Sequence, residues 1–445
     1  MTERFQELVE AKEYARLRQE FAECNEADIA AFLEELSDQH ELIRVFRILP
    51  KDMAADVFAF LELDVQQKII TSMTDHEAGD ILSNLFADDA ADVLEEMPAS
   101  VVKRLLANTD AETRRDINHL LRYPEDSAGS IMTVEFVDLK AALSVKEAIE
   151  KLRKVGVDKE TIYTCYVLDP QRKLIGTVSL RKLLLSPDDA KIEDIMEEHL
   201  ITANTLMDQE EVALMFQKYD FTSMPVVDSE NRLVGIVTVD DIVDILQQEA
   251  TEDIEKMAAI TSTDVPYMRT GAFETFKKRI PWLLLLMISA IFTERVIDSY
   301  TAALATCVVL TQFIPMLMGT GGNAGGQASA TIIRGLSLGE IEFSDILSVV
   351  WKELRVALLC GVTLAAASFV KLIFLNRVPL DVALVVCVTL VFTLLVAKLI
   401  GCCLPILAKK VGMDPAVVAS PIVTTILDIL SLVIYFRFAT IILHL

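Results

Sequence analysis

The last third of the chain contains five long apolar stretches, at residues 281–299, 301–318, 350–375, 380–408 and 415–443. A helix rises about 1.5 Å per residue, so roughly 20 apolar residues cross the hydrocarbon core of a bilayer. We therefore expect five membrane-spanning helices. An odd number of spans places the two termini on opposite sides of the membrane.

The charge of the chain is divided between two regions. Of its 41 basic and 66 acidic residues, 28 basic and 56 acidic residues precede Gly271. Residues 1–270 thus carry a net charge of −28 and the remainder +3. A strongly acidic region disfavours nucleic acid and anionic lipid as its partners and favours cations, although solubility alone would also explain it.

The basic residues around the apolar stretches predict an orientation. With the acidic region in the cytoplasm, the cytoplasmic flanks hold Lys277, Lys278, Arg279, Arg334, Lys352, Arg355, Lys409 and Lys410, and the external flanks hold mainly Arg295, Lys371 and Arg377. This bias indicates a multi-pass protein of the inner (plasma) membrane with a cytoplasmic N-terminus and an external C-terminus. The charged N-terminus predicts no cleavable signal peptide.

The acidic region divides into segments with different patterns. Residues 1–125 have apolar residues at helical spacing and a loose repeat, which predicts short helices stacked as a superhelix. Residues 126–190 and 191–248 repeat one unit: an apolar strand, an Asp-centred turn, Leu-(Ile/Val)-Gly and a second strand. Residues 249–275 predict a connecting helix, and residues 276–445 form the membrane part.

Asp428 lies in the middle of the fifth apolar stretch. An ionisable residue at bilayer depth costs roughly 2.5–3.5 kcal/mol, so it marks an ion or substrate path. Helical spacing predicts that it faces the bundle interior while Leu, Ile and Val face elsewhere. The residues expected on its stripe are Pro421, Thr424, Thr425, Ser431, Leu432 and Tyr435. The alternative is a buried Asp428 that pairs with Lys398 or is capped by backbone.

The second apolar stretch runs into the glycine-rich segment GTGGNAGGQ at 319–327. Pro315 predicts a helix break, and irregular backbone at membrane depth would line a water-filled cavity. The alternative is a helix-packing surface of small residues. Mg²⁺ prefers octahedral oxygen ligands and sheds water reluctantly, so a carboxylate with carbonyl and amide oxygens suits the hydrated ion. A symmetric dimer would bring two copies of Asp428 together.

Acidic residues also cluster before residue 260. The clusters are Asp88, Asp89 and Asp92; Asp208, Glu210 and Glu211; and Asp240, Asp241 and Asp244, which precede Glu249, Glu252, Asp253 and Glu255. Like charges packed in this way destabilise a compact assembly unless cations lie between them. A solvated acidic face is the alternative for any single cluster, but several clusters beside a membrane connector favour a divalent-cation sensor.

The whole chain resembles the MgtE family of magnesium channels. The segments that carry the resemblance are GTGGNAGGQ (319–327), DPAVVASPIVTTILD (414–428) and VTVDDIVDILQQEATEDI (237–254). The resemblance implies a mainly α membrane protein with an α-superhelical N-domain, tandem α/β CBS domains, a connecting (plug) helix and a five-span domain. It also implies a homodimer with both pore halves at the interface.

The resemblance assigns roles to individual acids. It places the pore carboxylate at Asp428 and the carboxylate of the cytoplasmic pore entrance at Asp414. The implied sensing acids are Asp88, Asp92, Asp208, Glu210, Asp220, Asp241, Asp244, Glu249, Glu252 and Asp253, and we expect Gly322, Asn323, Thr424 and Thr425 to line the pore. Some family members bind ATP between the CBS domains, but no local motif here indicates it.

We therefore expect a Mg²⁺-selective channel in the lipid bilayer, which imports Mg²⁺ and is closed by intracellular Mg²⁺ bound to the acidic clusters. The alternative is a secondary transporter of Mg²⁺ or of Co²⁺ or Mn²⁺. An enzyme is not expected, because the five histidines are scattered and the seven cysteines form no CxxC pair. Asp428 and the few basic residues inside the spans disfavour an anion channel.

Overall fold

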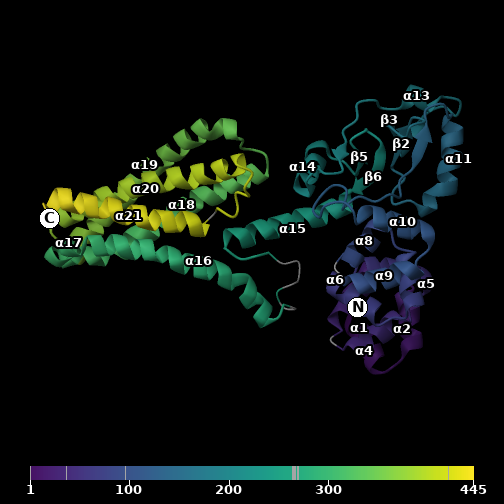
Figure 1. Cartoon of the computed structure of the whole chain (residues 1–445), viewed down its shortest axis with the longest axis horizontal. Coiled ribbons are helices and arrows are strands. Elements are labelled where there is room, and N and C mark those ends of the chain that lie inside the picture. The colour runs from purple at the N-terminus through teal and green to yellow at the C-terminus, as the bar shows by residue number, and fades with distance from the viewer. Residues whose placement is uncertain are drawn as a thin grey trace. The chain divides into compact units, whose positions relative to one another are not determined.

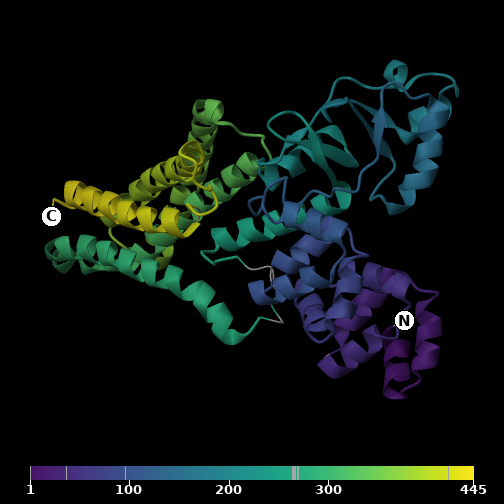
Figure 2. The same cartoon turned by 45° about the vertical axis from the view of Figure 1, so that its right-hand side comes forward.

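The computed structural model describes residues 2–36, 38–95, 97–262, 267, 270–418 and 420–444. The chain divides into two units, Met1–Leu246 and Gln247–Leu445 (Figure 1 and Figure 2). The first unit contains short helices and two small sheets, and the second contains the long apolar helices.

Among the described residues before Tyr123, ten helices of 8–10 residues form the N-terminal part of the first unit. Polar residues begin several of them: the Thr74 hydroxyl accepts the backbone N–H of Glu77, and the Glu77 carboxylate accepts that of Thr74. Such reciprocal capping satisfies N–H groups that lack an intrahelical partner. The helices are α1 (Thr2–Glu10), α2 (Tyr14–Phe21), α3 (Glu26–Glu35), α4 (Gln39–Phe46), α5 (Lys51–Ala59), α6 (Leu63–Thr71), α7 (Asp75–Leu82), α8 (Ala87–Glu95), α9 (Ala99–Asn108) and α10 (Ala111–Leu120).

Two three-stranded sheets of the same topology lie within the described range 97–262. In each, the first strand is parallel to the second, and the second is antiparallel to the third. The strands are β1 (Asp138–Lys140), β2 (Thr164–Leu168), β3 (Leu174–Ser179), β4 (Ala203–Asn204), β5 (Ser223–Val227) and β6 (Leu233–Thr238). The helices beside them are α11 (Val145–Val155), η1 (Gly156–Asp158), α12 (Leu180–Leu185), α13 (Ile192–Ile195), α14 (Gln209–Tyr219) and α15 (Val239–Met257).

The repeat expected from the sequence is present in both hairpins. The Asp169 carboxylate accepts the N–H groups of residues 171 and 173, and Asp228 accepts those of residues 230 and 232. The pairing register shifts at the corresponding place in both, between Val167 and Leu168 and between Val226 and Val227. The Asp-centred turn in the sequence therefore predicted both β-hairpins correctly.

The second unit is built from long helices. Among its described residues, four stretches are long and apolar enough to cross a membrane: Ala272–Ser299, Phe343–Asn376, Leu380–Lys410 and Pro421–Leu443. Helix α20 packs on α18, α19 and α21, α18 also packs on α21, and α16 contacts α21 (Figure 1). The elements are α16 (Ala272–Ser299), α17 (Thr301–Thr306), η2 (Val308–Phe313), α18 (Ile314–Ser337), η3 (Phe343–Asp345), α19 (Ile346–Val370), the π-helical turn η4 (Lys371–Asn376), α20 (Leu380–Lys410) and α21 (Ser420–Leu443).

The second expected span, at 301–318, is wrong in its position. Residues 301–313 form α17 and η2, and the long helix is α18, which begins at Ile314. Proline is compatible with the first turn of a helix, so Pro315 starts α18 instead of breaking it. With 24 residues, α18 is about 36 Å long. Five spans therefore stay a prediction.

Helix α15 also differs from the connecting helix expected at 249–275. It begins at Val239 and ends at Met257, where Ala259 adopts a left-handed conformation with φ of 54°. The N–H of Ile260 donates to the carbonyl of Glu255, and that of Ala259 to Lys256, at 2.9 and 3.0 Å. This Schellman pattern terminates a helix. Residues 263–266 and 268–269 lie outside the described residues.

Candidate cation sites

Asp428 lies in the middle of α21 and is partly buried. Among the described residues, its carboxylate has no hydrogen bond and no ion pair. Lys398, its expected alternative partner, instead lies 3.6 Å from Glu353 of α19. The reading in which Lys398 neutralises Asp428 is therefore wrong, because this ammonium is already beside another buried carboxylate.

The buried face of α21 differs from the predicted one. Several apolar side chains face the bundle, namely Val423, Leu427, Leu432, Phe436 and Ala439. Ser431 and Tyr435 are buried with them, and the Tyr435 hydroxyl donates to the Leu310 carbonyl at 2.9 Å. Asp428 and the two threonines lie at the edge of this face and are partly exposed. Of the predicted stripe, Ser431, Leu432 and Tyr435 are thus buried as expected, whereas the expectation that apolar residues face away from the interior is wrong within one chain.

The glycine-rich segment is a continuous stretch of α18, so the expected irregular backbone is wrong and the packing alternative is correct. Helical carbonyls are already bonded within the helix, which leaves few for an ion. A Cβ at Gly401 of α20 would overlap the carbonyl oxygen of Gly325, so α18 and α20 approach closely here only because residue 401 is glycine. A Cβ at Gly322 would lie 2.9 Å from Thr424, whereas Asn323 is exposed.

Three predicted acids come together where α15 meets the segment before α21. The ammonium of Lys256 lies 2.7 Å from both Glu252 and Asp414. Asp253 accepts a hydrogen bond from Ser337 at 3.1 Å. Burial alone would lower the pKa of Lys256, but its hydrogen bonds to Asp414 and Glu252 raise it overall. Burial also raises the pKa of Asp253, with a smaller contribution from Asp414 in the same direction.

A second acidic cluster lies in the first unit, between α8 and the start of α15. Asp88, Asp89 and Asp92 belong to α8, Asp240 and Asp241 begin α15, and Glu135 and Glu160 come from loops beside the first sheet. We call these seven residues the α8–α15 cluster. The sequence did not identify Glu135 and Glu160 as members, because only the fold brings them beside α8 and α15, which are far away in the chain.

Burial and mutual repulsion hold protons on the α8–α15 cluster. Burial, with a further contribution from Asp240, raises the pKa of Asp89 to about 6. Burial raises the pKa of Asp92, Glu160 and Asp241 to about 7, and neighbouring carboxylates add to each shift. The pKa of Asp88 is raised well above its usual range for the same reasons. Such a site gains most from a cation, which removes both the repulsion and the protons.

The other predicted sensor acids do not belong to the α8–α15 cluster. They are Asp208, Glu210, Asp220, Asp244 and Glu249. Asp208 caps α14 by accepting the N–H of Glu210 at 2.9 Å, and Asp220 ends the helix in a left-handed conformation. The helix of 11 residues between them is about 16 Å long, so the two acids of one chain lie at opposite ends of α14 and do not share a single ion. Asp244 is exposed one turn after Asp241, and Glu249 lies farther along α15.

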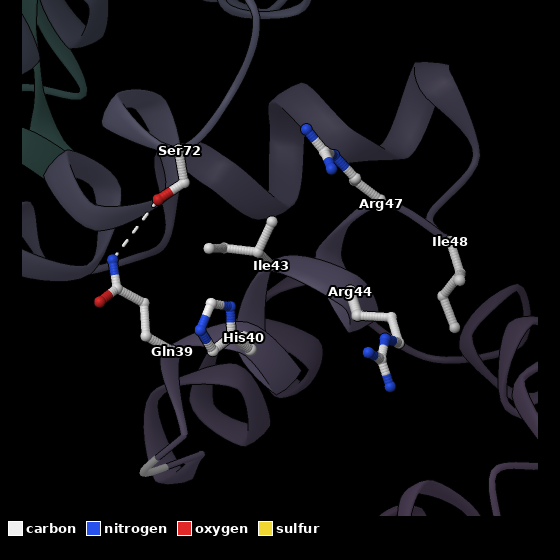
Figure 3. Close-up of a pocket in the computed structure, with 7 residues that line it drawn as sticks. All are labelled: Gln39, His40, Ile43, Arg44, Arg47, Ile48 and Ser72. Carbon is white, nitrogen blue, oxygen red and sulfur yellow. Dashed lines mark hydrogen bonds between the residues drawn. The ribbon is translucent and has the colours of Figure 1, made fainter.

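Neither the α8–α15 cluster nor the group of acids around Lys256 is a closed metal site. Among the described residues, no three His, Cys, Asp or Glu side chains converge tightly enough to hold a metal ion directly. Mg²⁺ usually keeps several of its waters, and a hydrated ion needs wider spacing. A cavity of about 670 Å³ on α4 is lined by His40, Arg44 and Arg47 and by no acid, so its charge does not suit a cation (Figure 3).

Three family models match the chain. The MgtE intracellular N domain matches residues 24–126, the CBS domain matches residues 128–187 and 192–248, and the divalent cation transporter MgtE matches residues 314–438.

Full-length relatives match as well. The magnesium transporter MgtE of Thermus thermophilus is 37% identical over 443 residues, which cover 99% of this chain and 98% of the relative. The magnesium transporter MgtE of Bacillus subtilis is 35% identical over 418 residues, which cover 94% and 92% of the two chains.

Two solved structures resemble the first part of the chain. The cytosolic domain of the Mg²⁺ channel MgtE in complex with ATP has a TM-score of 0.53 and 37% identity, and it covers 55% of this chain and 100% of that chain. The soluble part of a magnesium transporter has a TM-score of 0.53 and 33% identity, with 56% and 98% covered.

Proposed function

Because this chain belongs to the MgtE family, we propose that it is a Mg²⁺ transporter that works as a homodimeric channel closed by intracellular Mg²⁺. The names of the relatives support the ion, and the acidic clusters support the regulation. We place the protein in the inner (plasma) membrane, with the acidic unit in the cytoplasm and the C-terminus outside. The domain limits expected from the sequence stay a prediction, and we include them in this proposal.

The carboxylate of Asp428, which has no partner within the described part of the chain, is the observation that carries the pore proposal. A charged group at bilayer depth is costly unless water, a partner or a passing ion compensates it. Lys398 is beside Glu353 and does not compensate Asp428. Hydrated Mg²⁺ would bind Asp428 through its water shell, and the second copy in a symmetric dimer would supply a matching carboxylate. Gly322, Asn323, Thr424 and Thr425 would line the same path.

The α8–α15 cluster is the proposed sensor. Mg²⁺ bound among its carboxylates replaces protons and relieves their repulsion, which favours the compact arrangement of the first unit. A ligand shifts a conformational equilibrium only by its difference in affinity for the two states. Mg²⁺ meets this condition if the cluster is intact in the closed state and dispersed in the open one. Asp208, Glu210, Asp220 and Asp244 would add weaker sites.

The contacts of Lys256 link this sensor to the membrane helices. Helix α15 begins with Asp240 and Asp241 of the cluster and ends beside Ser337 of α18 and Asp414. Asp414 would lie at the cytoplasmic pore entrance, and Glu249, Glu252 and Asp253 would bind Mg²⁺ on α15. Closure then means docking of α15 against this entrance. ATP is a candidate second ligand, because one related cytosolic domain was crystallised with it.

The test is Mg²⁺ flux into proteoliposomes. Asp428→Asn keeps the size of the side chain and removes its charge, so flux should fall at least tenfold. Asp381→Asn, which changes an exposed acid at the start of α20, is the matched control and should transport normally. Normal flux in Asp428→Asn would place the path elsewhere. Single-channel currents in planar bilayers would separate a channel from a coupled secondary transporter.

A further inference from the structure

A cavity of about 400 Å³ lies where α18 ends, η3 begins and α20 ends. Its apolar lining comes from Leu336, Ile341, Phe343 and Ile406, and its basic lining from Lys409 and Lys410. Two of these elements belong to candidate membrane spans, because Phe343 begins one and Lys410 ends another. The cavity is therefore at the level where hydrocarbon meets water.

Both ammonium groups are held in place. Lys409 donates to the carbonyl of Leu336 at the end of α18, at 2.8 Å. Lys410 lies 3.6 Å from the centre of the Phe343 ring. An ammonium has three N–H donors, so both lysines keep donors for an incoming anion. Glu342 also lines the cavity, but its carboxylate accepts a backbone N–H of Asp345, and the lining stays net positive.

An apolar ridge leads away from the cavity along η3 and the start of α19. Phe343, Leu347 and Trp351 follow one another at four-residue spacing and therefore share a face. Their side chains are 41%, 80% and 63% exposed. Tryptophan is typical of the membrane–water interface. A small soluble anion would use only the lysines, whereas a lipid would use the lysines and the ridge together.

We propose that this cavity binds the phosphate of an anionic phospholipid. Lys409 and Lys410 donate to the phosphate oxygens, and the acyl chain lies along the ridge of Phe343, Leu347 and Trp351. A net negative headgroup is favoured over a zwitterionic one, because Lys409 and Lys410 outnumber Glu342 and leave the lining net positive. The site is independent of the proposed pore and sensor.

The test is native mass spectrometry of the full-length protein in detergent, titrated with phosphatidylglycerol or phosphatidylcholine. Phosphatidylglycerol should bind more tightly, and the double variant Lys409→Gln/Lys410→Gln should weaken its binding about thirtyfold, from the usual contribution of two lysines. Lys277→Gln/Lys278→Gln removes the same charge at the start of α16 and should bind normally. Lys410→Gln alone leaves the Lys409–Leu336 bond intact and should weaken binding about fivefold.

Three results would overturn the proposal. The first is unchanged phosphatidylglycerol binding in both cavity variants. The second is an equal loss in the α16 control, which would indicate a diffuse charge effect. The third is full displacement of the lipid by millimolar inorganic phosphate, which would indicate a site for a soluble anion.

Discussion

The ammonium of Lys398 on α20 lies 3.6 Å from the carboxylate of Glu353 on α19, and both side chains are almost fully buried. The pair ties together two helices that are candidate membrane spans. It also leaves Asp428 of α21 as an acid without a counter-ion among the described residues. Two buried or partly buried acids of one helical unit therefore have different environments, and they should respond differently to mutation.

Removal of one member of the Lys398–Glu353 pair should destabilise the protein strongly. Glu353→Gln leaves a buried ammonium without its carboxylate, which costs about 3–5 kcal/mol in comparable pairs. The double variant Glu353→Leu/Lys398→Met should recover most of this loss, because no charge is left behind. Thermal unfolding in detergent measures both. A Glu353→Gln protein as stable as the wild type would contradict this account.

Neutralisation of Asp428, in contrast to that of Glu353, should not destabilise the protein. Asp428→Asn removes a charge that has no counter-ion among the residues that the structure describes, so the unfolding temperature should stay the same or rise. Mg²⁺ flux should fall nonetheless. The two measurements on one preparation separate a transport role from a structural one. A large loss of stability would show that the carboxylate has a partner in the assembled protein.

The α8–α15 cluster should make stability depend on pH. Its carboxylates have higher pKa values in the folded protein than in the unfolded chain, so the folded state holds more protons between about pH 4 and 7. Stability without divalent ions should therefore fall as pH rises through this range. Mg²⁺ should stabilise the protein more at about pH 8 than at about pH 5.5, because ions and protons compete. Thermal unfolding of the full chain at both pH values measures this.

A matched pair of variants tests whether the cluster causes that behaviour. Asp92→Asn should raise the unfolding temperature without Mg²⁺ at high pH and should reduce the gain from Mg²⁺. Asp189→Asn changes an exposed acid outside the cluster and should leave both unaltered. If the two variants behave alike, the pH dependence arises elsewhere.

Loss of Lys256 should change the sensitivity of the gate. Lys256→Gln leaves Glu252 and Asp414 without the ammonium that lies 2.7 Å from each. Their repulsion should release α15 at low internal Mg²⁺, so closure should need a higher Mg²⁺ concentration. Flux measured against internal Mg²⁺ tests this, with Lys256→Arg expected to restore the charge. An unaltered closure curve would remove Lys256 from the mechanism.

The glycine contact between α18 and α20 should not tolerate a methyl group. Gly401→Ala places a Cβ against the Gly325 carbonyl, and such overpacking typically costs about 1–3 kcal/mol. Gly319→Ala meets no atom within 4 Å and should be neutral or slightly stabilising in a helix. Thermal unfolding compares the two. Equal effects would argue against close packing at Gly401.

The fold class was predictable from local patterns. Helical spacing, the Asp-centred turn and the apolar stretches are each set by neighbouring residues, and they identified the N-domain, the CBS repeat and the membrane helices. The start of α18 was not predictable in this way. Pro315 is compatible with either the end or the first turn of a helix, and only the packing of α18 against α20 and α21 decides between them.

The candidate sites were predictable only where neighbouring residues in the chain reveal them. Asp428 and the clustered acids stand out in the sequence because their neighbours are apolar or acidic. Glu160 and Lys256 do not stand out, since their importance comes from residues far away in the chain. The buried face of α21 was also hidden, because a helix that is apolar nearly all round has no periodicity to indicate which side packs.

The position of Lys256 has a consequence for how the proposed pore entrance responds to a low concentration of intracellular Mg²⁺. An ammonium that belongs to α15 is present near Asp414 at an effective concentration set by the helix geometry, whatever the cell contains. Free Mg²⁺ therefore adds to a positive charge that never dilutes. Such a tethered charge would hold α15 beside Asp414 when Mg²⁺ is scarce and would lower the Mg²⁺ concentration that closure needs.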